Sequence, residues 1–128
     1  MTSETVEIFM QRLQEAEQTG EVEPLVELFT EDAELLNLAR SQPLQGRDGA
    51  HVFWQDYLSV FKHIRSNFTN VVEGNSTAVL EWTSEGALST GEPLRYRGIS
   101  VIEINNGKVQ RFRTYYDSAA FLPQGAKQ

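Results

Sequence analysis

The sequence predicts an α+β fold in which three helices from the first half of the chain pack on one face of a curved antiparallel sheet. Apolar residues recur at helical spacing up to about residue 61. From residue 64 onward, apolar and polar residues alternate, as expected of half-buried strands. Short turn sequences separate the alternating segments, which favours pairing of consecutive strands and segregation of helices from sheet.

The first predicted helix covers residues 3–18, because apolar residues recur every three or four positions from Val6. Ser3, like the threonine before it, can cap the start of this helix, and Gly20 can end it. Pro24 suits the first turn of a second, shorter helix, where a backbone N–H is not needed. The two helices are expected to form a hairpin.

A short apolar strand is predicted over residues 33–38, followed by a loop through Pro43 and Gly46. Helical spacing returns in a third predicted helix over residues 48–61. One side of that helix is aromatic and consists of Phe53, Trp54, Tyr57 and Phe61.

Four longer strands are predicted in the second half, over residues 64–73, 77–88, 94–105 and 108–117. The last turn contains Asn106-Gly107, a dipeptide that favours a tight hairpin. Asp117 follows the last strand and is expected to cap a short terminal helix. Consecutive antiparallel pairing is therefore the simplest topology for this half of the chain.

Composition limits both the number of domains and the possible chemistry. A chain of 128 residues with 40% apolar content is expected to form a single domain over residues 1–128. The sequence contains no cysteine, which excludes disulfides and a thiolate nucleophile. His51 and His63 lack the spacing of a helical metal site, so neither a metal nor another cofactor is predicted.

Charge and hydropathy limit the expected partners. The net charge of −7 argues against binding to nucleic acid or to an anionic membrane, since both require clustered lysine and arginine. No stretch of the sequence is apolar for the roughly 18 residues that a membrane span needs. The acidic start of the chain lacks the pattern of a signal peptide, which predicts a cytoplasmic location.

Four short motifs occur in a characteristic order: Leu-Phe-Thr-Glu-Asp-Ala at residues 28–33, Gly-Arg-Asp at 46–48, Gly-Lys-Val at 107–109 and Arg-Thr-Tyr-Tyr-Asp at 113–117. With the predicted order of helices and strands, this pattern resembles the nuclear transport factor two-like superfamily, in its polyketide cyclase (SnoaL-like) branch. The resemblance implies a cystatin-like cone, closed by helices, that encloses a ligand pocket. It also implies a homodimer formed through the sheet.

Within that superfamily, the sequence is distantly similar to limonene epoxide hydrolase, in which an Asp–Arg–Asp constellation activates water with the help of a Tyr and an Asn. Carried over by position, the Asn falls on Asn37 and the Tyr on Leu35. The Arg falls on Glu81, one Asp on Thr83 and the other on Thr114. The epoxide-opening machinery is therefore expected to be absent.

Glu81 is the best candidate for acid–base chemistry, because the same correspondence points it into the cone, where an apolar environment would raise its pKa. Alternatively, Glu81 pairs with an arginine on a neighbouring strand. If Glu81 points inward, Trp82 lies on the outer sheet face and suggests a covered dimer interface. If the side chains of this strand alternate in the opposite sense, Trp82 points into the cone and Glu81 lies on the outer face.

Three functions remain open at this stage. The first is binding of a small, largely apolar molecule, and the second is acid–base catalysis of an isomerase, cyclase or hydratase type through Glu81. The third is a dimerising module whose pocket is filled by its own side chains. A threonine at position 114, where the resemblance implies a carboxylate, favours binding. The residues expected to contact the ligand are Asn37, Trp54, Tyr57, Thr83, Phe112, Thr114 and Tyr116.

Overall fold

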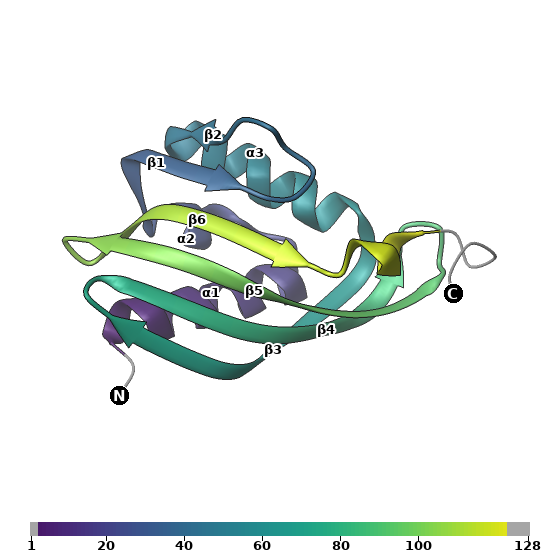
Figure 1. The fold of residues 1–128 in the computed structure, drawn as a ribbon. Helices are drawn as coiled ribbons and strands as arrows, with labels where there is room; N and C mark the ends of the chain where they lie inside the picture. Colours follow the sequence, from purple (N-terminus) through teal and green to yellow (C-terminus); the bar gives the residue numbers. More distant parts are fainter. Residues whose placement is uncertain (1–2, 123–128) are drawn as a thin grey trace.

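The computed structural model describes residues 3–122 and shows one curved, six-stranded sheet with the α-helices on one face (Figure 1). The elements in chain order are α1 (Glu4–Thr19), α2 (Glu23–Val26), β1 (Phe29–Leu36), β2 (Leu44–Gln45), α3 (Gly46–Ser59), β3 (Phe61–Gly74), β4 (Thr77–Leu88), β5 (Pro93–Asn105), β6 (Lys108–Tyr116) and the 3₁₀-helix η1 (Ser118–Phe121).

The ends of α1 follow the predicted capping chemistry. The Ser3 side chain accepts a hydrogen bond from the backbone N–H of Val6. Gly20 adopts a left-handed conformation with φ of 82°, and its N–H donates to the carbonyl of Ala16 at 2.8 Å. Glycine adopts this conformation without the steric cost that a side chain would add. The predicted start and end of the first helix are therefore confirmed to within one residue.

The sheet is mixed, which corrects the prediction of an antiparallel sheet. Strands β3 to β6 form the expected antiparallel meander, in the overall order β2-β1-β6-β5-β4-β3. Strand β1, however, runs parallel to β6, with Leu35 opposite Phe112. The short strand β2, which the sequence pattern did not predict, pairs with the outer edge of β1.

Strand β1 begins at Phe29 rather than at residue 33, and α2 is correspondingly short. Phe29 pairs with Val109 on β6 and is completely buried. Its backbone partner is distant in the sequence, so local periodicity could not distinguish the end of a helix from the start of a strand. As predicted, Asp117 caps η1, since its Oδ1 accepts from the N–H of Ala119 at 3.1 Å.

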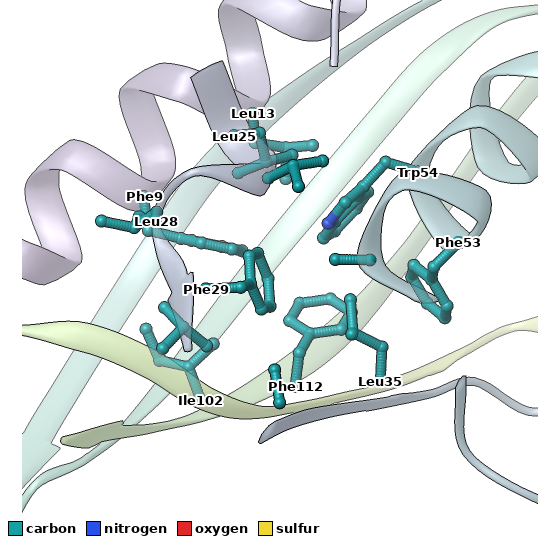
Figure 2. Packing of buried hydrophobic residues seen from close by; sticks show 14 of the residues in the cluster. Phe9, Leu13, Leu25, Leu28, Phe29, Leu35, Phe53, Trp54, Ile102 and Phe112 are labelled. Atoms are coloured by element: carbon teal, nitrogen blue, oxygen red, sulfur yellow. The ribbon is translucent and has the colours of Figure 1, made fainter. Parts of the chain in front are cut away.

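The main core lies where α1 and α3 pack against β1 and β6 (Figure 2). The Trp54 ring is central to it, with its centroid 5.0 Å from that of Phe112 and 6.3 Å from those of Phe9 and Phe29. Such distances are typical of packed aromatic pairs. Within residues 3–122, no helix is both long and apolar enough to cross a membrane.

Candidate functional site

A cavity of about 480 Å³ lies between α3, the concave face of the sheet and η1. Half of its lining residues are aromatic: Phe53, Trp54, Tyr57, Phe61, Phe68, Trp82, Tyr96, Phe112, Tyr116 and Phe121. Its polar lining consists of Asn37, Arg40, Asp56, Ser66, Ser84, Ser100 and Thr114.

The side chains of β4 alternate between the two sheet faces in the opposite sense to the one predicted. Trp82 lines the cavity and is only 8% exposed, whereas Glu81 and Thr83 are exposed on the outer face. The register explains the error: Leu80 pairs with Ser100, which in turn pairs with Thr114. Because residues opposite one another in a sheet share a face, an inward Thr114 places Leu80 inward and Glu81 outward.

Glu81 therefore does not point into the cone, and the proposed general acid or base is misplaced. Its Oε1 accepts a hydrogen bond from Asn70 Nδ2 at 3.0 Å, on the outer side of β3 and β4. This partner is an amide rather than the arginine considered as the alternative. Thr83, expected to contact the ligand, is likewise outside the cavity. The argument for a dimer interface built on an outward Trp82 fails for the same reason.

The Trp82 indole lies against the backbone of β5, where Gly98 makes room for it. A Cβ atom at Gly98 would lie 2.6 Å from Trp82 Cζ2 and 2.4 Å from the carbonyl oxygen of Tyr115. Trp82 Nε1 donates to Ser100 Oγ at 2.9 Å, and the hydroxyls of Ser100 and Thr114 share a hydrogen bond of 2.9 Å. The indole nitrogen is thus satisfied inside the cavity wall.

The remaining predicted ligand residues all line the cavity, although this placement does not test whether they bind anything. They are Asn37, Trp54, Tyr57, Phe112, Thr114 and Tyr116. Asn37 lies in the loop after β1, where its Oδ1 accepts from the N–H of Ala39 at 2.9 Å. Such a contact to the residue two positions on shapes a turn. Asn37 therefore helps to hold the loop at the rim.

A buried group of hydrogen bonds, missed by the sequence analysis, lies at the inner end of the cavity. Tyr57 Oη and Ser66 Oγ both donate to Glu17 Oε2 at 2.6 Å, and the Ser66 N–H donates to Oε1 at 2.9 Å. Ser66 Oγ is also 2.6 Å from Ser84 Oγ, and the Tyr96 hydroxyl lies beside those of Tyr57 and Ser84. Tyr57, Ser66, Ser84 and Tyr96 are called the hydroxyl cluster below. All four line the cavity, with Glu17 behind them.

Burial dominates the electrostatics of this end. It raises the pKa of Glu17, although the hydrogen bonds from Ser66 and Tyr57 oppose the rise. Burial also raises the pKa of Tyr57 well above its ordinary value, and the pKa of Tyr96 for the same reason. Both phenols therefore stay protonated near neutral pH. They can donate or accept hydrogen bonds, but they do not supply a phenolate base.

Two charged residues occur at the rim of the cavity, and they are paired with each other. Arg40 Nη2 lies 2.7 Å from Asp56 Oδ2. A larger hollow of about 730 Å³ is found at the end of β3, β4 and β5, lined in part by Arg65, Glu85 and Arg95. There Glu85 bonds both arginines, at 2.8 and 3.0 Å. The cavity under α3 is the better site, because its lining is aromatic and its polar groups converge.

Comparison with protein families agrees with this architecture. The SnoaL-like domain family matches residues 10–112, most of the chain. The chain belongs to the SnoaL-like domain family. This assignment confirms the family inferred from the sequence motifs. No curated protein sequence matches the chain.

Solved structures similar to this SnoaL-like domain extend over nearly the whole chain. An NTF2-like protein from Anabaena variabilis is 21% identical, with a TM-score of 0.82 and coverage of 94% of this chain and 96% of the other. A protein of ketosteroid isomerase-like fold from Catenulispora acidiphila, in complex with trimethylamine, is 15% identical, with a TM-score of 0.82 and coverage of 100% and 96%. TerC, co-crystallised with polyporic acid, is 17% identical, with a TM-score of 0.78 and coverage of 93% and 95%. At these identities the likeness establishes the fold.

Proposed function

We propose that this protein binds a small, largely apolar molecule in the cavity beneath α3. The observation that carries the proposal is the lining: half of the lining residues are aromatic, and a few hydroxyl groups converge at one end. Small-molecule sites typically combine these features, since apolar walls supply affinity and a few polar groups fix orientation. A volume of about 480 Å³ is large enough for a ligand of one to three rings.

Two similar structures support the proposal, because each was determined with a small organic molecule, trimethylamine in one and polyporic acid in the other. The fold alone does not decide between binding and catalysis, since one fold hosts many functions. Catalysis through Glu81 is not retained, because that carboxylate lies on the outer face. Binding is therefore the function that the geometry favours.

Several expectations from the sequence stay predictions. They are the homodimer, the cytoplasmic location, and the absence of a cofactor and of nucleic-acid and membrane partners. For the dimer, the supporting residues now change. Ile99 and Tyr115, which are paired on the outer sheet face, are 39% and 48% exposed. They are better candidates for a covered interface than the inward Trp82.

Tryptophan fluorescence tests the proposed function directly, because the chain has two tryptophans and both line the cavity. Titration with tetralin, a bicyclic hydrocarbon, should change the fluorescence in a saturable way and raise the melting temperature. Ser84→Leu should weaken binding, since Ser84 is 2% exposed and its added methyl groups would enter the cavity.

Thr83→Leu is the matched control, because it adds a similar side chain on the outer face of the same strand. It should leave tetralin binding unchanged. A folded wild-type protein that shows no saturable response to tetralin would reject the proposed function, as would equal losses in the two variants.

A further inference from the structure

We propose that the inner end of the cavity selects ligands whose polar group is a hydrogen-bond donor, namely an alcohol, a phenol or an amine, because Glu17 orients the protons of Tyr57, Ser66 and Ser84 away from the ligand. The inference rests on the proposed function and deepens it, since it names the chemical class of the ligand and the residue that sets the specificity.

The contacts of Glu17 are those of an ionised carboxylate. Its oxygens receive three donors: the Tyr57 hydroxyl, the Ser66 hydroxyl and the Ser66 N–H. Both hydroxyl contacts measure 2.6 Å, within the range of roughly 2.5–2.7 Å that is typical of an O–H group donating to a charged oxygen. A carboxylate surrounded by donors in this way accepts from all of them.

The count of protons then fixes the direction of the cluster. Each hydroxyl has a single proton, and Tyr57 and Ser66 donate theirs to Glu17. The hydrogen bond between Ser66 and Ser84 must therefore be donated by Ser84. At that point three of the four hydroxyls have no proton left for a ligand.

Tyr96 is the exception in the cluster. Its hydroxyl lies beside those of Tyr57 and Ser84, whose own protons are already used. The Tyr96 proton is therefore the one that can still turn, toward one of these two oxygens or toward the cavity. Tyr57, Ser66 and Ser84 offer the cavity lone pairs only. A ligand hydroxyl or ammonium group can donate to these three oxygens, whereas a ketone or ether oxygen can accept from Tyr96 alone in the cluster.

The wall formed by Ser100 and Thr114 has no such constraint. These hydroxyls bond each other, and Ser100 also accepts from Trp82. Only one of their two protons lies between them, and either residue can supply it, while Thr114 Oγ1 can also donate to the carbonyl of Ile99 at 3.5 Å. This second polar wall of the cavity can therefore adapt to a donor or an acceptor, and it serves as an internal reference.

Exchanging Glu17 for glutamine should reverse the direction of the hydrogen bonds in the hydroxyl cluster. The amide keeps one carbonyl oxygen for the Ser66 N–H, but its NH₂ group now donates to the oxygens of Tyr57 and Ser66. Their protons must then turn elsewhere, and the cavity provides the available space. The same side-chain shape thus converts an acceptor surface into one that can donate.

The test compares 2-tetralol with 2-tetralone, which share a ring skeleton but differ as alcohol and ketone. By tryptophan fluorescence, the wild-type protein should bind the alcohol about 3- to 10-fold more tightly, the usual value of one hydrogen bond. In Glu17→Gln this ratio should fall to within about twofold, and the affinity for the ketone should rise in absolute terms. If Glu17 had a merely structural role, Glu17→Gln would lower the affinities for both ligands by the same factor.

Two further variants complete the design. Glu15→Gln makes the same change at an exposed position on α1 and should preserve the wild-type ratio. Tyr57→Phe removes one acceptor oxygen from the cluster and should reduce the preference for the alcohol, which provides a second test if Glu17→Gln folds poorly.

The outcomes separate this inference from the proposed function. Binding of tetralin with equal affinities for alcohol and ketone would overturn the inference while leaving the proposed function intact. An alcohol preference that persists in both Glu17→Gln and Tyr57→Phe would also overturn it. A protein that binds none of the three probes would reject both.

Discussion

The concave face of the sheet carries two aromatic clusters that have opposite characters. At the closed end, Phe9, Phe29 and Phe112 pack with Trp54 in a core between the sheet, α1 and α3 (Figure 2). At the open end, the cluster consists of Phe61, Trp82, Tyr96, Tyr116 and Phe121, and it borders the cavity. The same sheet therefore supports a filled core at one end and a hollow at the other.

Polar atoms account for much of this difference. The closed end is built mainly from Phe and aliphatic side chains, which pack without needing partners, and in the described part of the chain its Trp54 Nε1 is buried without a hydrogen bond. At the open end Trp82, Tyr96 and Tyr116 carry indole or hydroxyl groups, and buried polar atoms of this kind need hydrogen bonds. Trp82 finds its partner in Ser100 and Tyr57 in Glu17, so the walls are held by hydrogen bonds around a space. Directional hydrogen bonds can hold the side chains of a cavity wall in place where packing alone would close the cavity.

The largest expected effect is a difference in stability between the two clusters. Phe9→Ala, in the closed end, should lower the free energy of unfolding by about 3–5 kcal/mol, because Phe9 is completely buried and its removal leaves a cavity. Phe121→Ala, at the edge of the open end, should cost about 1 kcal/mol, since fewer contacts are lost there. Urea denaturation measures both values, and similar losses would show that the open end is packed as tightly as the closed one.

The next effect concerns the close approach of Trp82 to β5. Gly98→Ala should destabilise the protein by about 1–3 kcal/mol, because the new methyl group overlaps both the indole and the backbone of β6. It should also displace Trp82 and shift its fluorescence. Gly74→Ala is the matched control, since a Cβ there would meet no atom within 4 Å. If Gly98→Ala left stability and fluorescence unchanged, the indole would not lie against the strand.

A smaller effect is the contribution of Glu17 to the pH dependence of the free energy of unfolding. Its pKa is raised above the ordinary value of 4.5, so on increasing pH the unfolded chain ionises at this position before the folded one does. The contribution of Glu17 to stability is therefore greatest below pH 4.5 and falls as the pH rises through its folded pKa. The groups that face it are Tyr57 on α3, Ser66 on β3 and Tyr96 on β5.

Glu17→Gln isolates this contribution, because other titrating groups cancel in the difference between variant and wild type. The variant should gain stability relative to the wild type between acidic and neutral pH, as measured by denaturation over that range. Glu103 provides a contrast: Arg113 and Arg111 lower its pKa, so its contribution is lost as the pH falls. A relative loss for Glu17→Gln on raising the pH would contradict the burial argument.

Much of the fold could be predicted from the sequence, because its signals are local. The caps at Ser3 and Gly20, the strand periodicity and the Asn106-Gly107 turn all act over a few residues. The parallel pairing of β1 with β6 could not be predicted in this way, since Phe29 and its partner Val109 are far apart in the chain. The family resemblance predicted the cone-shaped fold, but it did not predict how the residues of neighbouring strands pair.

The site was only partly predictable, for two physical reasons. A shift of one residue in register reverses the face of every side chain on a strand, which moved Glu81 and Thr83 outward and Trp82 inward. Glu17 was missed because it lies on a helix that otherwise shows an ordinary amphipathic pattern, and its partner Ser66 is on β3. Tyr96 could have been found, since it alternates with the buried Leu94 along a predicted strand.

The smallest expected effect is that of Glu81→Gln, and it sharpens the comparison between the two sides of the sheet. Glu81 and Glu17 would undergo the same chemical change, from carboxylate to amide, but Glu81 is exposed and bonds Asn70 on the outer face. An amide oxygen can still accept that bond, and surface substitutions of this kind usually change stability by less than about 0.5 kcal/mol. Glu81→Gln should therefore leave unchanged both the affinity for tetralin and the ratio of 2-tetralol to 2-tetralone binding, whereas Glu17→Gln should alter the ratio. Calorimetric titration of the two variants side by side makes the comparison, and an altered ratio in Glu81→Gln would mean that the outer carboxylate communicates with the cavity despite facing away from it.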